Sequence, residues 1–253
     1  SDEESVHRVQ EDLSKMEAVI HLAAYIPADT SKNDDADAEE CLKNVFATIR
    51  LLSALRDAKK MRAFVYASSF EVYGVPKTAP VHEEHPTQPL TYYGASKLIG
   101  EKYLEIFSRD MHTHYSILRF PAIYGPGDTI RRAIGNFIQA AVGKTLDIYG
   151  DGKDLRDLVY VSDAAEAIVK ALEHSADGVF NIGNGVGLSI RDMAEAVQDA
   201  AHHALEIQNH PRTKPRIDFF FDITRARTVL HWEPTVSLKE GILSQLAWIK
   251  EKH

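Results

Sequence analysis

Tyr93 and Lys97 are separated by four positions in the segment Tyr93-Gly94-Ala95-Ser96-Lys97. On a helix this spacing places both side chains on the same face, one turn apart. A phenol with a pKa of about 10 is a poor base at neutral pH, but a fixed cation beside it favours the phenolate and lowers that pKa. The pair therefore suits removal of a proton from an alcohol while a hydride leaves the same carbon, and it predicts a Tyr93 pKa lowered by Lys97.

Two other tyrosine–lysine pairs have the same spacing, Tyr73 with Lys77 and Tyr149 with Lys153. Both contain glycine or proline and are typical of turns, in which this spacing does not bring the side chains together. The Tyr93 pair instead opens a helical pattern whose residues Leu98, Tyr103, Leu104 and Phe107 are spaced for one buried face. From this motif alone, an ordinary surface helix is the alternative interpretation.

Runs of apolar residues on either side of this segment predict buried strands. The run at 63–67 is apolar and aromatic, and Ser68 and Ser69 follow its carboxyl end. An earlier run at 18–24 ends in small residues that allow close approach of a ligand, and a third run occupies 115–120. In open α/β sheets ligands bind beyond the carboxyl ends of the strands. Ser69 is therefore placed to hydrogen-bond a substrate oxygen.

Helical patterns separate these strands. Apolar residues follow helical spacing over 36–58, a segment that includes Asn44, and the helix predicted at 92–108 precedes the third strand. Strands that alternate with helices in this way indicate an α/β fold with a Rossmann-like, doubly wound parallel sheet. The elements after about residue 125 predict a smaller α/β lobe.

With these elements in place, the chain resembles the extended short-chain dehydrogenases/reductases, in the branch of NAD-dependent nucleotide-sugar epimerases and dehydratases. The resemblance runs from about Val19 to Ile249 and depends on an ordered set of short motifs. These are His21-Leu22-Ala23-Ala24, Asn44, Ser68-Ser69 with Val72-Tyr73-Gly74, Tyr93 with Lys97, Arg119, Tyr124-Gly125-Pro126-Gly127, Tyr149-Gly150-Asp151-Gly152, Arg156-Asp157 and Asn181-Ile182-Gly183. Each motif is weak alone, but the ordered set is specific.

The resemblance implies that NAD is the cofactor and that Ser69, Tyr93 and Lys97 are catalytic. Tyr93 would accept and donate the proton, Lys97 would hold the nicotinamide ribose, and Ser69 would hydrogen-bond the reacting sugar hydroxyl. Asn44 would support Lys97 through its backbone and a water. The implied cofactor-binding residues are Leu22, Ala23, Ala24, Asn44, Ala67, Ser68, Tyr93, Lys97, Phe120 and Pro121.

The resemblance also implies a set of substrate-binding residues, which are Ser69, Glu71, Arg156 and Arg212. Arg156 matches the family arginine that binds the substrate diphosphate, and a guanidinium can grip phosphate oxygens bidentately. Arg212 lies where a second such arginine often occurs, although Lys214-Pro215 comes after it where the family usually has Gly-Asp. For both Glu71 and Arg212, a surface residue without a ligand is the alternative interpretation.

These residues lead to one main hypothesis and several alternatives. The main one is an epimerase acting at carbon 4 of a UDP-hexose through transient oxidation to a keto-sugar, with a nucleotide sugar as substrate. Dehydration is disfavoured because Phe70 stands where dehydratases have aspartate, and decarboxylation because the residues between Tyr93 and Lys97 differ. An NAD-dependent sugar dehydrogenase and a catalytically silent nucleotide-sugar-binding fragment are the other hypotheses.

The family begins with a strand, a glycine-rich turn and a helix whose N-terminus holds the pyrophosphate. No such segment occurs in these 253 residues. Residues 1–5 resemble the segment after the third strand of the family, and 6–14 predict the next helix. The glycines at 183–187 lack the dinucleotide-binding spacing and predict a turn. We therefore expect the first two strand–helix units to be absent from this sequence.

Composition excludes several classes of function. The net charge of −8, with Arg131-Arg132 as the one adjacent arginine pair, disfavours nucleic-acid and membrane surfaces. No apolar run reaches membrane-spanning length. Cys41 is the single cysteine, so no intrachain disulfide can form, and a cytoplasmic location is expected. His82 and His85 are three positions apart and precede Pro86, so a helical metal site is not predicted.

We expect an NAD-binding domain at 1–125 and a substrate-binding lobe at 126–253, with 155–182 partly returning to the first. Within the lobe, a helix is predicted at 128–142. Capping boxes are predicted at Ser189 with Asp192 and at Ser237 with Glu240. The helices at 36–58 and 92–108 look like the pair that this family uses to form a homodimer.

Overall fold

The computed structural model describes residues 10–28, 33–128, 132–143, 145–202, 206–212 and 215–252. Its central element is a parallel sheet with the strand order β1–β2–β3–β8. The strands are β1 (Ala18–His21), β2 (Ala63–Ser69), β3 (His114–Phe120) and β8 (Gly178–Asn181). The predicted α/β class with a parallel sheet is confirmed.

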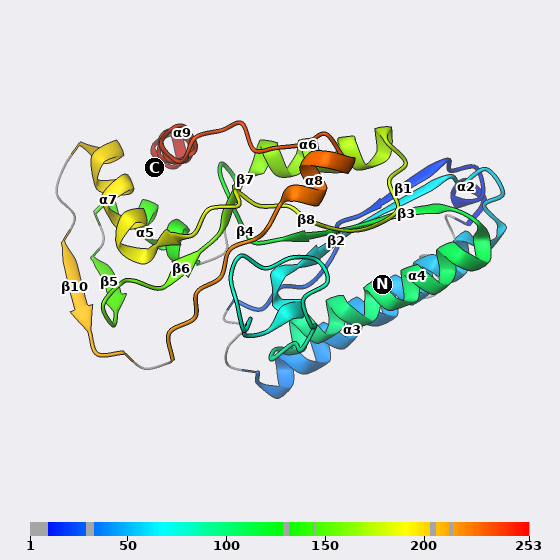
Figure 1. The fold of residues 1–253 in the computed structure, drawn as a ribbon, viewed down its shortest axis with the longest axis horizontal. Coiled ribbons are helices and arrows are strands. Elements are labelled where there is room, and N and C mark those ends of the chain that lie inside the picture. Colours follow the sequence, from blue (N-terminus) through cyan, green and yellow to red (C-terminus); the bar gives the residue numbers. More distant parts are fainter. Residues whose placement is uncertain are drawn as a thin grey trace.

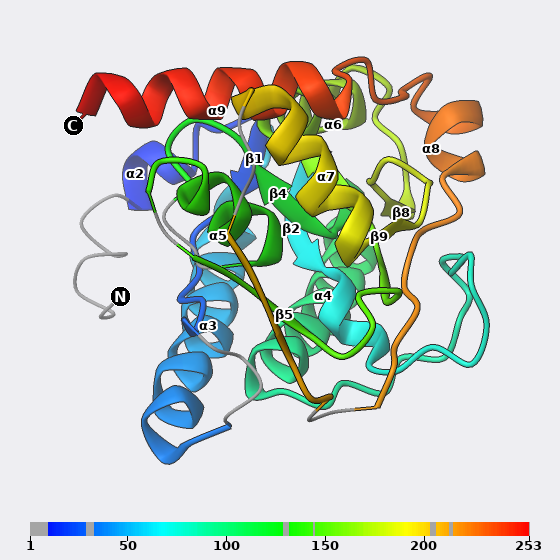
Figure 2. The ribbon, with the colours of Figure 1, turned by 90° about the vertical axis from the view of Figure 1, so that its left-hand side faces the viewer.

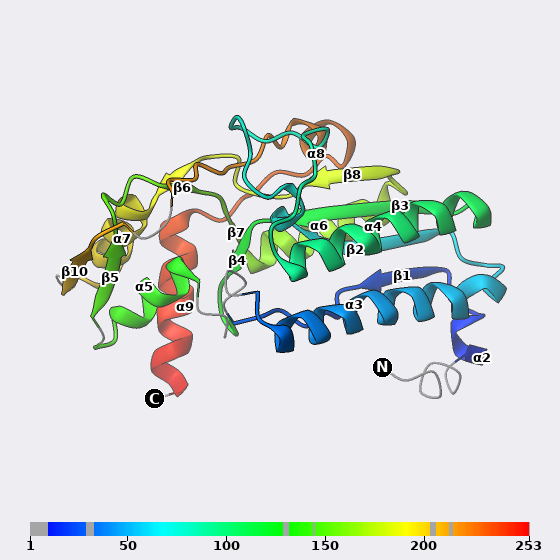
Figure 3. The ribbon, with the colours of Figure 1, turned by 90° about the horizontal axis from the view of Figure 1, so that it is seen from below.

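Helices cover both faces of this sheet, as Figure 1 shows. α3 (Asp35–Ala54) and α4 (Tyr92–Met111) lie side by side on one face, which Figure 3 shows from another direction, and α6 (Val161–Glu173) covers the other face. Strand β2 is buried along almost its whole length because it has a strand on each side and helices above and below. This position explains its unbroken apolar run.

The helix α4 carries the Tyr93–Lys97 pair and begins at a well-defined N-cap. The Thr91 hydroxyl accepts a hydrogen bond from the backbone N–H of Gly94 at 2.9 Å. A Cβ on Gly94 would lie 2.6 Å from the carbonyl oxygen of Glu71, so only glycine allows this close approach. The helix extends to Met111, beyond the predicted end at 108, and stops where His112 takes a left-handed conformation.

A second body contains the helices α5 (Ala133–Ala140), α7 (Ile190–Ala201) and α9 (Leu238–Lys252), which share one hydrophobic core (Figure 2). The predicted capping boxes at Ser189 and Ser237 are both present. The helix predicted at 128–142 is shorter in the structure: it begins after Arg132 and ends at Ala140, and residues 129–131 lie outside the described part.

The chain crosses between the two bodies more than once. Strand β7 (Leu158–Tyr160) pairs with β4 (Ala122–Tyr124), after which α6 packs against the main sheet and β8 pairs with β3. The remaining elements are α2 (Gln10–Leu13), η1 (Leu55–Asp57), η2 (Phe70–Tyr73), β5 (Leu146–Tyr149), β6 (Leu155–Arg156), β9 (Leu188–Ser189), β10 (Ile207–His210) and α8 (Thr224–Val229).

Two further sequence expectations concern the first helix and membrane-spanning segments. The helix predicted at 6–14 corresponds to α2, and the residues of that prediction before Gln10, like the segment 1–5, lie outside the described part. Among the helices of the described residues, none has the length and apolar character needed to cross a membrane.

Candidate active site

Tyr93 and Lys97 lie together at the carboxyl end of β2, and both are almost completely buried. The Nζ of Lys97 is 5.8 Å from the centroid of the Tyr93 ring and 4.9 Å from that of Tyr66. It donates a hydrogen bond to the carbonyl oxygen of Ala67 at 2.8 Å. Helix α4 thus presents both residues on one face, and the end of β2 fixes the position of the ammonium group.

Burial is the largest influence on the pKa of both groups. It lowers the pKa of Lys97 to about 8, while the nearby Glu101 carboxylate opposes this change. Burial raises the pKa of Tyr93, and Glu71 raises it further, whereas Arg132 lowers it. The predicted lowering of the Tyr93 pKa by Lys97 is therefore wrong for this structure. Desolvation of the phenolate outweighs the attraction of Arg132, the cation that lowers the pKa of Tyr93 here.

Ser69 is the last residue of β2, and Glu71 lies in the turn η2 that follows, next to the start of α4. The Ser69 hydroxyl accepts a hydrogen bond from the backbone N–H of Glu71 at 3.2 Å and caps the turn. One carboxylate oxygen of Glu71 accepts from the Thr91 hydroxyl at 2.7 Å, and the other lies 4.0 Å from Nη2 of Arg132. Because Thr91 also caps α4, Glu71 ties the turn to the helix that carries Tyr93.

A cleft of about 230 Å³ opens beside this turn. Apolar side chains line much of it, among them Phe70, Pro121 and Phe219, and two cationic side chains, Arg132 and Arg156, also face it. Sequence reasoning missed Arg132, Phe70 and Phe219 as lining residues. For Arg132 a signal existed, because it belongs to the adjacent arginine pair. For Phe219 none did, because it comes from a distant segment of irregular structure.

The residues after β1 are held by Asn44. Its side-chain oxygen accepts from the backbone N–H of Tyr25 at 2.7 Å, and its amide donates to the Tyr25 carbonyl oxygen at 2.9 Å. This bracket fixes the segment that comes after Leu22, Ala23 and Ala24, of which Leu22 is exposed. The side chain of Asn44 therefore acts on the β1–α3 connection, and its support of Lys97 through the backbone stays a prediction.

Three further residues predicted to bind the cofactor lie at or next to the carboxyl ends of the central strands. Ser68 is buried, and its hydroxyl donates to the carboxylate of Glu101 on α4. Phe120 ends β3 and is buried, and the adjacent Pro121 lines the cleft. The ends of β2 and β3 therefore meet beside the cleft, but the Ser68 hydroxyl points to another protein group.

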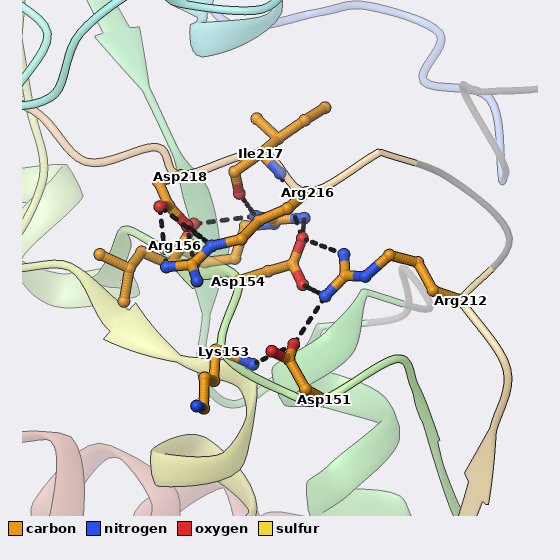
Figure 4. Close-up of polar contacts among 9 residues, drawn as sticks. Asp151, Lys153, Asp154, Arg156, Arg212, Arg216, Ile217 and Asp218 are labelled. Carbon is orange, nitrogen blue, oxygen red and sulfur yellow. Dashed lines mark hydrogen bonds and ion pairs between the residues drawn. The ribbon is translucent and has the colours of Figure 1, made fainter.

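Arginines and aspartates form a cluster next to the cleft (Figure 4). Nη1 of Arg156 donates to the carbonyl oxygens of Leu155, at 2.8 Å, and Ile217. Arg212 grips Asp154 bidentately, at 3.1 and 2.8 Å, and contacts Asp151 at 2.7 Å. Of the two arginines predicted to bind the diphosphate, Arg156 lines the cleft. Arg212 is not among the lining residues, because the two aspartates hold its guanidinium.

The hydrogen-bond partners of the Lys97 ammonium indicate whether the site fits a dinucleotide cofactor. It has three N–H donors, and among the described residues only the Ala67 carbonyl accepts a hydrogen bond from it. Buried donors of this kind are normally satisfied, so hydroxyl acceptors such as those of a ribose fit this position.

The described residues contain no group of three or more His, Cys, Asp or Glu side chains arranged to hold a metal ion.

Comparison with known proteins agrees with this geometry. The model of the NAD dependent epimerase/dehydratase family matches residues 1–183. The chain belongs to this family. It is 33% identical over 245 residues to a putative UDP-glucose 4-epimerase of Methanocaldococcus jannaschii, over 94% of this chain and 78% of that protein. It is 34% identical over 247 residues to a UDP-glucose 4-epimerase of Mycolicibacterium smegmatis, over 94% and 77%.

Solved structures of epimerases have the same fold. UDP-glucose 4-epimerase of Thermotoga maritima with UDP-glucose gives a TM-score of 0.86 at 28% identity and covers 100% of this chain and 84% of that one. UDP-glucuronic acid 4-epimerase of Bacillus cereus in complex with NAD gives 0.85 at 28% identity, over 100% and 80%. This member of the epimerase/dehydratase family is therefore an NAD-dependent enzyme with a Rossmann-like fold.

Proposed function

We propose that this family member is a nucleotide-sugar 4-epimerase that acts on a UDP-hexose through transient oxidation of the sugar. The observation that carries the proposal is the buried pair of Tyr93 and Lys97 on α4 at the end of β2, the strand that ends in Ser69. None of the three lines the cleft, but Phe70, the residue after Ser69, does, together with Arg132 and Arg156. UDP-glucose 4-epimerases among its relatives and structural neighbours support it.

The proposed roles of the three residues follow from their positions. Tyr93 takes the proton from the C4 hydroxyl and later returns it, and Ser69 orients that hydroxyl from the end of the strand. Lys97 uses its remaining N–H groups to hold the ribose of the cofactor. Because burial raises the pKa of Tyr93, its phenol is neutral in this structure, and the cations Arg132 and Lys97 would favour the phenolate that the proton transfer requires. Bound NAD supplies a reversible acceptor of hydride at the sugar carbon. The proton moves between the sugar oxygen and the phenolic oxygen of Tyr93.

Substrate anchoring falls to the cations that line the cleft. Arg156 and Arg132 face the same space, and the N-terminus of α5 opens beside Arg132. Guanidinium groups and helix N-termini both favour phosphate oxygens. We therefore assign the diphosphate to these two arginines. Tyr93 is not among the residues that line the cleft, so the proposal requires the sugar to extend from the cleft toward Tyr93. Arg212, which the sequence placed in this role, would need to leave Asp151 and Asp154 to take part.

A coupled assay tests the function. The protein is supplied with NAD and UDP-galactose, and formation of UDP-glucose is monitored by nucleotide-sugar chromatography. We expect interconversion without net accumulation of NADH, because the cofactor is regenerated in each cycle. Absence of turnover with a panel of UDP- and dTDP-sugars would remove the proposal.

The same assay separates the alternatives. A net sugar dehydrogenase would accumulate NADH in step with substrate, which absorbance at the reduced nicotinamide band detects. A dehydratase or decarboxylase would give products of lower mass. Phe70 provides no acid beside the site, and the Glu71 carboxylate is engaged by Thr91. A silent nucleotide-sugar binder would bind UDP-sugar in calorimetric titration without turning it over.

We propose the division at about residue 125 into an NAD-binding domain and a substrate lobe, and a cytoplasmic homodimer as the working form. The dimer proposal is supported by apolar side chains on α3 and α4 that are at least 40% exposed: Leu42, Phe46, Ile99, Tyr103 and Ile106. Because α3 and α4 pack side by side, these side chains suit a second copy of the same pair.

Charged substitutions on this surface should separate the subunits. The double change Phe46→Glu and Ile106→Glu is expected to halve the mass measured by light scattering, because apposed carboxylates repel and cannot be desolvated cheaply. The change Leu243→Glu, on the exposed side of α9, is the matched control and should leave the mass unchanged. A wild-type protein that is already monomeric would contradict the proposal.

A further inference from the structure

The carboxylate of Glu101 lies at the centre of a buried polar network below the proposed site. Glu101 is one turn after Lys97 on α4 and has no exposed surface. One of its oxygens accepts from Nε of Arg119 at 2.9 Å and from the Ser68 hydroxyl, and the other accepts from Nη2 of Arg119 at 2.6 Å. The ion pair is bidentate, and Arg119 is 3% exposed.

The network joins three elements at the level of the catalytic lysine. Ser68 and Arg119 are direct neighbours in the β2–β3 register, and Glu101 reaches both from α4. Ser68 comes directly after Ala67, whose carbonyl oxygen receives the Lys97 ammonium. A single carboxylate therefore fixes the ends of two strands and the helix turn that carries Lys97.

We propose that Glu101 is a positioning residue for the reaction, which holds the end of β2 against α4 and maintains the positive charge of Lys97. The proposal rests on the proposed function for its effect on turnover, but its structural content concerns Lys97 alone. A buried ion pair contributes little net stability. The burial of the Glu101–Arg119 pair is therefore explained better by a role at the site than by a contribution to the stability of the core.

The charge balance around Lys97 favours Glu101 as the group responsible. From β1, β2 and α4 the titratable neighbours of Lys97 are His21, Tyr66, Tyr93 and Glu101. Burial and Lys97 together lower the His21 pKa to about 4, so its imidazole is neutral at pH 7. Burial raises the pKa of both tyrosines, so they are neutral as well.

Glu101 is faced by two cations, Lys97 on its own helix and Arg119 on β3, and by neutral hydrogen-bond donors. Arg119 from β3 is its ion-pair partner, Ser68 donates from β2, and Tyr73 from η2 lies against the guanidinium of Arg119 at 4.7 Å. Glu83 contributes its backbone carbonyl to Arg119, and its carboxylate accepts from the backbone N–H of Asn181. Glu101 is therefore the anion that acts on Lys97 in this network.

The test measures the titration of Lys97 directly. Protein labelled with carbon-13 at lysine Cε is titrated by NMR, with Lys97→Met used to assign the resonance. In Glu101→Gln we expect the Lys97 midpoint, which lies near 8 in the wild type, to fall by about one pH unit, since the opposing anion is gone. This measurement needs neither cofactor nor substrate.

A second variant guards against loss of folding. Glu101→Gln leaves Arg119 buried without its partner, which can unfold a protein, whereas replacement of both members of a buried pair by apolar residues is often tolerated. The double variant Glu101→Met and Arg119→Met should fold and show a smaller fall in the Lys97 midpoint than Glu101→Gln. The control Glu105→Gln, on the same helix and paired with Lys102, should leave the midpoint unchanged.

The pH profile of kcat provides an independent test of the role of Glu101. If Lys97 must be charged, the alkaline limb of the kcat profile should move to lower pH in Glu101→Gln by the same amount as the NMR midpoint. An unchanged Lys97 midpoint in the double variant would overturn the inference about Glu101. Absence of turnover in the wild type would instead refute the proposed function and leave the NMR result to decide this inference.

Discussion

Tyr93→Phe should lower turnover by roughly 100- to 10,000-fold, the usual contribution of a positioned acid–base group. The variant keeps the ring that packs beside Lys97 and removes only the phenolic oxygen. Folding should be preserved, because no described residue is hydrogen-bonded to that oxygen in the structure. Binding of UDP-sugar, measured by calorimetry, should stay within about threefold of the wild type, since the diphosphate is assigned to Arg132 and Arg156.

The neighbouring Tyr92→Phe provides the control for this prediction. Tyr92 precedes Tyr93 on the same helix but is 44% exposed, so loss of its hydroxyl should leave turnover within about twofold. Equal turnover by Tyr93→Phe and the wild type would mean that another group moves the proton.

Lys97→Met should abolish activity and at the same time stabilise the fold. Burial of this ammonium lowers its pKa from 10.5 to about 8, which corresponds to roughly 3 kcal/mol of unfolding free energy lost at pH 7. Loss of the hydrogen bond to Ala67 offsets about 1 kcal/mol of the gain. We therefore expect the variant to be about 2 kcal/mol more stable than the wild type at pH 7.

The stability difference between Lys97→Met and the wild type should depend on pH. Between pH 8 and 10.5 the unfolded chain binds more protons at Lys97 than the folded chain, so wild-type stability rises with pH in that window. The advantage of Lys97→Met should shrink over the same window. Denaturant melts at pH 7 and pH 10 measure it, with the exposed Lys102→Met as control. A less stable variant at pH 7 would contradict a destabilising role for the buried charge.

The sequence was sufficient for those features that depend on local pattern. The run at 63–67 has the apolar character of a strand buried on both faces, and the Tyr93 helix has an apolar pattern, so both elements were predicted correctly. On that helix Leu104 and Phe107 are buried as predicted, but Tyr103, predicted on the same buried face, is 46% exposed. The capping boxes at Ser189 and Ser237 are local too, because their partners are three residues away.

The features that the sequence did not reveal depend on packing between distant segments. The raised pKa of Tyr93 results from its burial, which no spacing along the chain encodes. The pairing of Arg212 with Asp154 joins residues far apart in sequence. Likewise, Glu101 is an ordinary helix position until β3 places Arg119 opposite it. Charge pairs of this kind need the tertiary structure.

The return of the chain to its central sheet limits how this enzyme can be recombined. Strand β8 joins the sheet only after the chain has passed through β4, α5 and β7, and the segment 217–223 then packs beside η2. The lobe therefore cannot be exchanged as one continuous segment of sequence. A chimera that takes its sugar specificity from a relative must exchange at least two separate stretches of sequence. It must also preserve the packing of the segment 217–223 against η2.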